Sequence, residues 1–490
     1  MWDPYKLLAA SVFTDPLANE NVKNGTLTEL PYIPIDRYGI NGQPMLPAQF
    51  ELAGFDKNEP GTWPMLQPFY FPASPFTWVG DDHHYPQPPT SDPFYWPNIS
   101  IYWDMANGEL IDFRPVDVRA VMPEVRRAWQ ISYRSEFAEG APTADVATIL
   151  IPENYNGRHL LCYAPYQDSV NFDCSPSYAY LTGLRDPSVD ALLIQGWAVV
   201  MPDHQGKRNS FGSGYRSGKS VLDSIRATIE AQEYLPFSFE KIAMTGYSGG
   251  AIAIGYASEL QSEYAPELDI CGSAFGGVIV DLNATLSVIN KGLFSAYALG
   301  GFYGLAQECQ IMDILEASLK DNAKTRANEI QNHCLIWDVL DYVGQDIFAY
   351  FKDGPAVLNQ DDFRRVLERE RMGFNTPSMP LFIYQADSDE IAPAEKVNGL
   401  VDFYCQNGAR VDYHMDSQIG HLLEAVAATP ALIKFLHKCF EENYVPDLYP
   451  DHIASIQANA MDVPLMDDID AISRKAYNFW KGLGLPYIPL

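Results

Sequence analysis

The sequence is poor in positive charge, and it contains no long hydrophobic run. Its 490 residues include 33 Lys and Arg against 63 Asp and Glu, which gives a formal net charge of -30 at pH 7. Nucleic acids and anionic membrane surfaces would repel such a chain, so we expect neither as a partner. No stretch approaches the ~20 consecutive apolar residues that a membrane-spanning helix needs. We therefore expect no stable membrane insertion, whereas contact with a lipid interface stays open, as does the oligomeric state.

The sequence is also poor in cysteine. Seven cysteines are spread along the chain, and no Cys-x-x-Cys pair occurs. This count is too low for a dense disulfide framework, and the spacing is not that of a metal site. The run Asp81-Asp82-His83-His84 does not change this conclusion, because neighbours in an extended segment point to opposite sides and cannot converge on one ion. The sequence therefore predicts neither a metal ion nor a cofactor.

The first ninety or so residues differ in composition from the remainder. They are rich in proline and aromatic residues and have no clean periodicity, as in Glu59-Pro60-Gly61-Thr62-Trp63-Pro64. A disordered tail would carry fewer aromatic residues. We therefore expect residues 1–90 to be an extension that packs on a main domain formed by residues 91–490.

From about residue 145, short apolar strands alternate with amphipathic helices. Strand patterns fall at 146–151, 160–163, 197–201, 242–245, 270–275 and 381–384, and a helix is expected over 217–234. Near-continuous apolar strands separated by helices indicate an α/β fold with a mostly parallel sheet covered on both faces. Between about 278 and 378 only helical spacing remains. We expect a helical insertion there, either a mobile lid or an ordinary packed layer.

The pentapeptide Gly246-Tyr247-Ser248-Gly249-Gly250 follows one of these strands and precedes an apolar helix pattern. This arrangement is the Gly-x-Ser-x-Gly nucleophile elbow, in which the serine occupies a strained turn. The glycines let the strand and the helix approach each other closely. The start of the helix directs backbone N–H groups toward the space beside the serine. The pattern predicts Ser248 as a nucleophile, although a glycine-rich turn that happens to hold a serine would look similar.

A serine nucleophile needs a base, and the base needs an acidic group that orients it. In α/β-hydrolases these residues follow the serine in the order acid, then histidine. Asp387 and Asp389 both come directly after the strand expected at 381–384. We favour Asp389, because Pro393 soon begins the next helix and fixes the loop between them.

The candidate base is His421, which opens the helix expected over 422–427. Two other histidines fit this role less well. His414 should lie inside a strand, where a structural role is expected, and His204 precedes the serine, against the order of this arrangement.

The elbow and several further segments together resemble the fungal secretory lipase family of α/β-hydrolases. The segments are Tyr166-Gln167-Asp168-Ser169, Asp173-Cys174-Ser175-Pro176-Ser177-Tyr178, Leu181-Thr182-Gly183-Leu184, Gly196-Trp197, Asp203-His204-Gln205-Gly206, Gly246-Tyr247-Ser248-Gly249-Gly250-Ala251, Tyr264-Ala265-Pro266-Glu267-Leu268 and Asp389-Glu390-Ile391-Ala392-Pro393. The likeness runs from about residue 92 to near the C-terminus. It implies an α/β-hydrolase fold, a helical lid corresponding to 278–378, and the hydrolysis of carboxylic esters.

The resemblance also implies roles for individual residues. It gives Ser248 as nucleophile, Asp389 as acid and His421 as base, in agreement with the reasoning from the residues. It adds an oxyanion hole formed by Asp168 and the backbone N–H of Gly249. An ionised carboxylate would repel an oxyanion, so Asp168 must either be protonated or act through its own backbone N–H. Without the resemblance, we would expect Asp168 to be an aspartate that caps a helix or stabilises a loop.

A disulfide between Cys174 and Cys334 is likewise implied by the resemblance. The chain departs from the family at the second disulfide, which would use Cys405, because the usual partner after the last helix is absent. Cys439 is a candidate substitute for that partner. The extension over 1–90 has no counterpart in the family, whereas 482–486 resembles its glycine-containing flap.

Three Asn-x-Ser/Thr sequons begin at Asn24, Asn98 and Asn283. Such triplets are acceptors for N-glycosylation in secreted proteins. The apolar stretch 7–13 is too short for a convincing signal peptide. We therefore expect a secreted, extracellular glycoprotein from which the leader is missing in this chain.

Taken together, these patterns predict a serine carboxylic ester hydrolase, a lipase or esterase that works through an acyl-enzyme and acts on a lipid or small-molecule ester. An acyltransferase or esterase dedicated to one specialised metabolite would use the same residues, and the extension over 1–90 motivates this alternative. A non-catalytic binding protein on a hydrolase fold is the alternative of another class. Such proteins usually lose a catalytic residue, and none is missing here.

Overall fold

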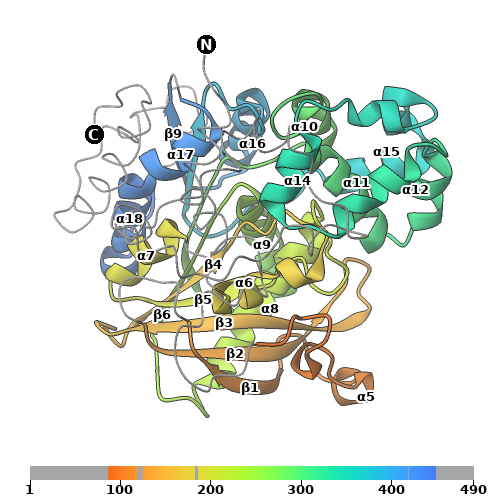
Figure 1. Ribbon diagram of the computed structural model, residues 1–490. Coiled ribbons are helices and arrows are strands. Elements are labelled where there is room, and N and C mark those ends of the chain that lie inside the picture. The colour runs from red at the N-terminus through yellow and green to blue at the C-terminus, as the bar shows by residue number, and fades with distance from the viewer. Residues whose placement is uncertain (1–85, 119–124, 183–185, 418, 448–490) are drawn as a thin grey trace, which may run out of the picture.

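The computed structural model describes residues 86–118, 125–182, 186–417 and 419–447, which Figure 1 draws in colour. Within them, one mixed sheet crosses the molecule in the strand order β1-β2-β3-β5-β4-β6-β7-β8-β9. Its strands are β1 (Leu110–Val116), β2 (Val125–Glu136), β3 (Pro142–Pro152), β4 (His159–Ala164), β5 (Ala198–Pro202), β6 (Lys241–Tyr247), β7 (Ile270–Gly276), β8 (Leu381–Ala386) and β9 (Val411–Asp416). The extension predicted over 1–90 falls almost wholly outside the described residues.

The two halves of the sheet differ in strand direction. All neighbouring pairs from β5 to β9 are parallel, whereas β1, β2, β3 and β5 pair antiparallel. The sequence prediction, with strands beginning near residue 145, missed β1 and β2. β1 is largely exposed at the edge, and β2 buries polar side chains such as Gln130 and Ser135, so neither forms an apolar run. Gln130 donates to the Ser177 carbonyl at 2.9 Å, and Ser135 donates to Asp223 at 2.7 Å.

Helices cover both faces of the sheet. Around the sheet lie α5 (Ile99–Tyr102), α6 (Pro176–Leu181), α7 (Pro187–Ile194), α8 (Gly214–Ala231), α9 (Gly249–Tyr264), α16 (Ala394–Gln406), α17 (His421–Ala427) and α18 (Thr429–His437). Side chains alternate along β4: Leu160 and Cys162 belong to the core under α8 and α9, while Leu161 and Tyr163 belong to the core under α7 and α18. This two-sided covering confirms the predicted α/β architecture.

The helix predicted over 217–234 is α8, which ends three residues earlier. Val221 and Ile225 are fully buried, but Ile229 is 38% and Tyr234 58% exposed. The apolar stripe is buried only where the helix lies over the strands, and the apolar spacing placed the end of the helix three residues too late.

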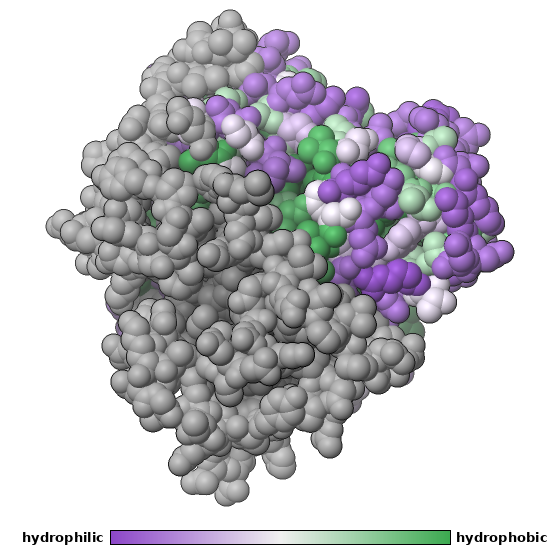
Figure 2. Space-filling view, turned by 45° about the horizontal axis from the view of Figure 1, so that its top comes forward, coloured by the Kyte–Doolittle hydropathy of each residue, from purple (hydrophilic) through white to green (hydrophobic). Residues whose placement is uncertain are grey.

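A helical layer, called the lid below, is formed by the chain between β7 and β8. It contains α10 (Leu282–Ile289), α11 (Ser295–Glu308), α12 (Met312–Ser318), α13 (Lys324–Asn328), α14 (Leu335–Tyr342) and α15 (Asp361–Arg369), joined by short turns of 3-10 helix at Glu329–Gln331, Ile347–Tyr350 and Gly354–Asn359. Figure 1 shows it beside the top of the sheet. Its outer surface is mainly hydrophilic, whereas apolar side chains gather on its side toward the middle of the view in Figure 2.

Buried carboxylates attach the lid to the main domain. Glu308, the last residue of α11, accepts hydrogen bonds from Ser210 Oγ at 2.5 Å and from the Ala138 backbone N–H at 2.6 Å. Glu370, directly after α15, accepts from the Gly214 N–H at 2.8 Å, at the start of α8. Along the described part of the chain, no helix combines the length and apolar character required to cross a membrane.

Candidate active site

Ser248 occupies a strained turn between β6 and α9. Its φ of 54° and ψ of -119° lie in a region that side chains other than glycine rarely adopt. Glycines make the turn feasible: a Cβ added to Gly250 would overlap the Ala164 carbonyl, and one added to Gly246 would lie 2.6 Å from the Gly250 carbonyl. The Ser248 N–H donates to the Gly276 carbonyl at 3.0 Å. The local sequence thus folds into the elbow that the pentapeptide predicts.

The structure brings Ser248, His421 and Asp389 into one line of hydrogen bonds. His421 Nε2 lies 2.8 Å from Ser248 Oγ, and His421 Nδ1 lies 2.8 Å from Asp389 Oδ2. An ionised carboxylate can only accept, so Nδ1 carries the proton and Nε2 accepts from the serine hydroxyl. Asp387 is exposed on the same turn, and its carboxylate accepts from Ser388 Oγ at 2.8 Å.

The Asp389 side chain is fully buried, and three donors besides His421 hold it in place. Its Oδ1 accepts from the backbone N–H groups of Ile391 and Ala392, at 2.9 and 2.7 Å. Its Oδ2 accepts from Gln385 Nε2 at 2.9 Å. These bonds fix the direction in which the carboxylate faces the imidazole.

The surrounding charges favour the protonated form of His421. Burial by itself lowers the pKa of the imidazole, because a buried charge loses its hydration. The negative charge of Asp389 and its hydrogen bond act in the opposite direction, with smaller contributions from Glu390 and Asp168. The effect of these acidic groups exceeds that of burial, so the pKa of His421 lies above its ordinary value. The ring is therefore well suited to take up a proton from Ser248.

Asp168 and Gly249 lie against each other beside the serine. Asp168 has a φ of 46°, and a Cβ added to Gly249 would overlap its Oδ1. Burial raises the pKa of Asp168 to about 7, although the positive charge of His421 acts against this shift. Among the described residues, Asp168 Oδ1 has no hydrogen-bond partner. Gly249 is the first residue of α9, so its N–H has no partner within that helix.

His204 stabilises the loop that carries Asp168. It was not favoured as the general base because it precedes the serine in the sequence. Its Nε2 donates to the Pro165 carbonyl at 2.8 Å, and its Nδ1 accepts from Ser217 Oγ at 3.2 Å. Burial lowers the pKa of His204 to about 4, so the ring is neutral near pH 7. The likeness of the segment 203–206 to the secretory lipases was the only sequence signal for this contact.

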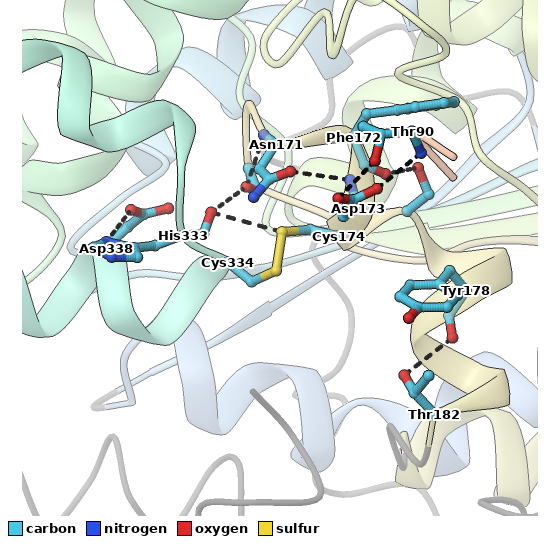
Figure 3. The surroundings of a disulfide bond; sticks show 12 residues. Thr90, Asn171, Phe172, Asp173, Cys174, Tyr178, Thr182, His333, Cys334 and Asp338 are labelled. Atoms are coloured by element: carbon cyan, nitrogen blue, oxygen red, sulfur yellow. Dashed lines mark hydrogen bonds and ion pairs between the residues drawn. A yellow bond between two sulfur atoms is a disulfide. The ribbon is translucent and has the colours of Figure 1, made fainter. Parts of the chain in front are cut away.

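A disulfide joins this same loop region to the lid (Figure 3). Cys174 is bonded to Cys334, which directly precedes α14, and their Cα atoms lie 5.6 Å apart. Alongside the bond, Ser169 Oγ donates to the His333 carbonyl at 3.0 Å. Asp168 is therefore one residue from a direct contact with the lid.

The other cysteines do not form a second disulfide. Cys405 and Cys439 are both buried and unpaired, so the substitute pairing suggested by the sequence is not formed. Asn98 and Asn283 are both exposed, whereas Asn24 and the segment 482–486 lie outside the described residues. Over the described ranges, no group of three or more His, Cys, Asp or Glu side chains is arranged to hold a metal ion.

Comparisons with known proteins agree with this geometry. The sequence profile of the secretory lipase family matches residues 174–447. Lipase A of Arthroderma benhamiae is 32% identical over 374 residues, which cover 72% of this chain and 79% of that protein. A secreted triacylglycerol lipase of Malassezia globosa is 33% identical over 339 residues, which cover 66% of this chain and 74% of that protein.

Solved structures give the same result. Candida antarctica lipase A in its closed state superposes with a TM-score of 0.72 at 29% identity, covering 80% of this chain and 96% of that one. A second structure of that lipase covers 82% of this chain and 99% of its own, with a TM-score of 0.70. The predicted α/β-hydrolase fold is confirmed. The chain belongs to the secretory lipase family and is a carboxylic ester hydrolase.

Proposed function

We propose that this hydrolase cleaves lipid esters through an acyl-enzyme formed on Ser248, with His421 as general base and Asp389 as the acid that orients it. The observation that carries the proposal is the hydrogen-bonded line from Ser248 Oγ through both nitrogens of His421 to Asp389. The strained elbow presents the hydroxyl, and the buried carboxylate selects the tautomer that can accept its proton. Each group is within reach of the next without rearrangement.

The first half of the reaction transfers the acyl group to the protein. As Ser248 Oγ forms a bond to the acyl carbon, its proton moves to His421 Nε2, and Asp389 stabilises the resulting imidazolium. The carbonyl oxygen becomes an oxyanion. His421 then returns the proton to the leaving alcohol as the ester C–O bond breaks. In the second half a water molecule repeats these steps in place of the serine and releases the carboxylic acid.

The oxyanion is stabilised by the Gly249 N–H and by Asp168. A pKa of about 7 keeps the carboxyl of Asp168 protonated in weakly acidic solution, where it can donate instead of repelling the developing charge. The unsatisfied Oδ1 and its contact with Gly249 support this role.

We place the substrate among lipid esters and the site of action outside the cell. Relatives at about one third identity include a secreted triacylglycerol lipase, and a long acyl chain needs apolar surface such as that on the inner side of the lid in Figure 2. The exposed sequons at Asn98 and Asn283 are compatible with glycosylation on an extracellular route.

Replacement of the nucleophile tests the proposal. Ser248→Ala should reduce kcat for p-nitrophenyl esters by a factor on the order of 10⁶, as in other serine hydrolases. A fluorophosphonate should label the native protein once, at Ser248, and should not label the variant. A variant that keeps full activity would overturn the assignment of the nucleophile. A native protein that is neither labelled nor active would favour the binding protein on a hydrolase fold.

A further inference from the structure

The backbone of His421 is held on both sides by side chains from other elements. Its N–H donates to Glu390 Oε2 at 2.9 Å, and its carbonyl accepts a hydrogen bond from the Tyr247 hydroxyl. Tyr247 directly precedes Ser248, and Glu390 directly follows Asp389. We infer that Tyr247 and Glu390 are positioning residues that hold His421 in line for proton transfer. This inference rests on the proposed role of His421 as base.

The two contacts act on different peptide units. The N–H belongs to the peptide that precedes the Cα of His421, and the carbonyl belongs to the peptide that follows it. Holding both planes fixes φ and ψ at His421, because these are the only soft backbone torsions of a residue. The direction of the Cα–Cβ bond is then set, and the hydrogen bond to Asp389 sets the remaining rotation of the ring.

Glu390 supplies an acceptor that the helix itself cannot provide. His421 is the first residue of α17, whose N-terminal N–H groups have no intrahelical partner, and the preceding residue, Gly420, has no side chain to cap them. A Cβ added to Gly420 would lie 2.5 Å from Glu390 Oε2, so glycine at this position lets the carboxylate approach. The short helix is therefore anchored from the β8–α16 loop.

Tyr247 holds the opposite side through its ring and its hydroxyl. Its ring centroid lies 5.0 Å from that of His421 and 5.8 Å from that of Tyr384. Burial, together with the charges of Asp389 and Glu424, raises the pKa of Tyr247 well above its ordinary value, so the hydroxyl remains a donor. A Cβ added to Gly277 would lie 2.7 Å from the tyrosine ring and 2.8 Å from His421 Cε1. Glycine there leaves room for both rings.

The two residues differ in charge, and this difference can be measured. The imidazole faces Asp389 and Glu390 from the loop after β8, Asp168 from the loop after β4, and the neutral Tyr247 and Ser248 from the end of β6. Glu424 lies one turn along α17, where burial and the charges of Asp416 and Asp389 raise its pKa. Glu390 thus contributes position and negative charge, whereas Tyr247 contributes position alone.

Single substitutions separate these contributions. Tyr247→Phe should lower kcat about tenfold or more, because small displacements of a catalytic group are costly, with KM and the acid limb of the pH profile unchanged. Glu390→Ala should lower kcat similarly and move the acid limb to lower pH. Glu390→Gln keeps an oxygen acceptor for the His421 N–H, so it should recover most of kcat while the acid limb stays shifted.

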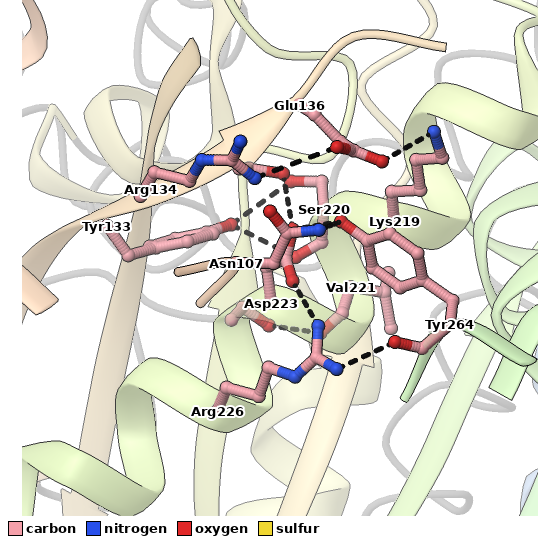
Figure 4. Close-up of polar contacts among 12 residues, drawn as sticks. Asn107, Tyr133, Arg134, Glu136, Lys219, Ser220, Val221, Asp223, Arg226 and Tyr264 are labelled. Atoms are coloured by element: carbon pink, nitrogen blue, oxygen red, sulfur yellow. Dashed lines mark hydrogen bonds and ion pairs between the residues drawn. The ribbon is translucent and has the colours of Figure 1, made fainter. Parts of the chain in front are cut away.

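Matched controls separate positioning from a general loss of stability. Tyr133→Phe also removes a buried hydroxyl, which lies 3.0 Å from Ser220 Oγ in the network of Figure 4. Tyr133 is on β2, which is separated in the sheet from β6, the strand before Ser248, by β3, β5 and β4. Glu395→Ala removes an exposed carboxylate five residues from Glu390. Both controls should keep native kcat when rates are divided by the fraction of protein that a fluorophosphonate labels.

The inference is wrong if Tyr247→Phe and Glu390→Ala stay within about twofold of native kcat per labelled site, or if Tyr133→Phe is equally impaired. It is also wrong if Glu390→Gln recovers no more activity than Glu390→Ala. Failure of the native protein to label at Ser248 would instead count against the proposed mechanism as a whole, so the two failures are distinguishable.

Discussion

The two sides of the site are held in different ways. On the serine side, the backbone is closely packed: Ser248 has a positive φ, Gly250 lies against the Ala164 carbonyl, and Gly249 lies against the Asp168 carboxyl. On the histidine side, the side chains of Tyr247 and Glu390 each make one hydrogen bond to the first residue of the seven-residue helix α17. Steric packing leaves no tolerance for added atoms, whereas hydrogen bonds can be removed one at a time. Substitutions on the first side should therefore disrupt the site, and those on the second should loosen it.

Apart from loss of the nucleophile itself, the largest effect is expected from Gly249→Ala, which disrupts the close packing on the serine side. The new Cβ would overlap Asp168 Oδ1, so either the carboxyl or the elbow must shift. We expect kcat to fall by about 10²–10³-fold, as on loss of one oxyanion donor. Gly399→Ala in α16 is the control, because a Cβ there meets no atom within 4 Å. Near-native kcat in Gly249→Ala would contradict the close packing of Gly249 against Asp168.

A smaller effect, confined to one range of pH, is expected from Asp168→Asn. If the protonated carboxyl donates to the oxyanion, native kcat should fall as the pH rises through about 7, the pKa of Asp168. The amide donates at every pH, so the variant should keep its rate above pH 7. The carboxyl binds its proton more tightly in the folded state than its ordinary pKa of 3.8 allows.

The same variant has a consequence for stability. Because the folded pKa exceeds the unfolded one, native unfolding free energy should decrease as the pH rises from about 4 to about 7, and Asp168→Asn should remove this part of the dependence. Thermal melts and kcat measured over the same buffers test both statements. A native alkaline limb that persists unchanged in the variant would assign the oxyanion contact to the backbone N–H of Asp168.

The smallest effect on rate is expected from removal of the disulfide. The bond closes a separation of 160 residues, and Cys174→Ser with Cys334→Ser should cost about 2–5 kcal/mol of unfolding free energy. The contact of Ser169 with His333 remains, so kcat at 25 °C should change by less than about tenfold. Melting curves and rates of the double variant, compared with those of reduced native protein, test this. A rate loss as large as that of Gly249→Ala would mean that the bond itself positions the loop that carries Asp168.

Much of the fold was predictable from the sequence, because buried parallel strands and their helices leave periodic apolar patterns. β4, β5, β6 and β8 were found in this way, and so was the elbow. β1 and β2 were missed because an exposed edge strand and a strand with buried polar residues carry no such pattern. The end of α8 was misplaced because periodicity does not say where the sheet beneath a helix stops.

The site was predictable where chain order constrains it. Ser248, Asp389 and His421 follow a fixed sequence of elements, and the structure brings their side chains within hydrogen-bond distance. Tyr247 and Glu390 carried no such signal, although both are neighbours of predicted residues. Both side chains bond to the backbone of His421. Because every residue other than proline has the same backbone groups, such a contact cannot be inferred from residue types.

The Cys174–Cys334 bond has a practical consequence for preparing the protein. Thiols stay reduced in the cytosol of common bacterial hosts, whereas the periplasm and the secretory pathway allow them to be oxidised. Material purified from a reducing compartment would therefore lack the covalent link between the lid and the segment that carries Asp168, and would keep the hydrogen bond from Ser169 to the His333 carbonyl. Heat tolerance measured on such a preparation would underestimate that of the oxidised enzyme.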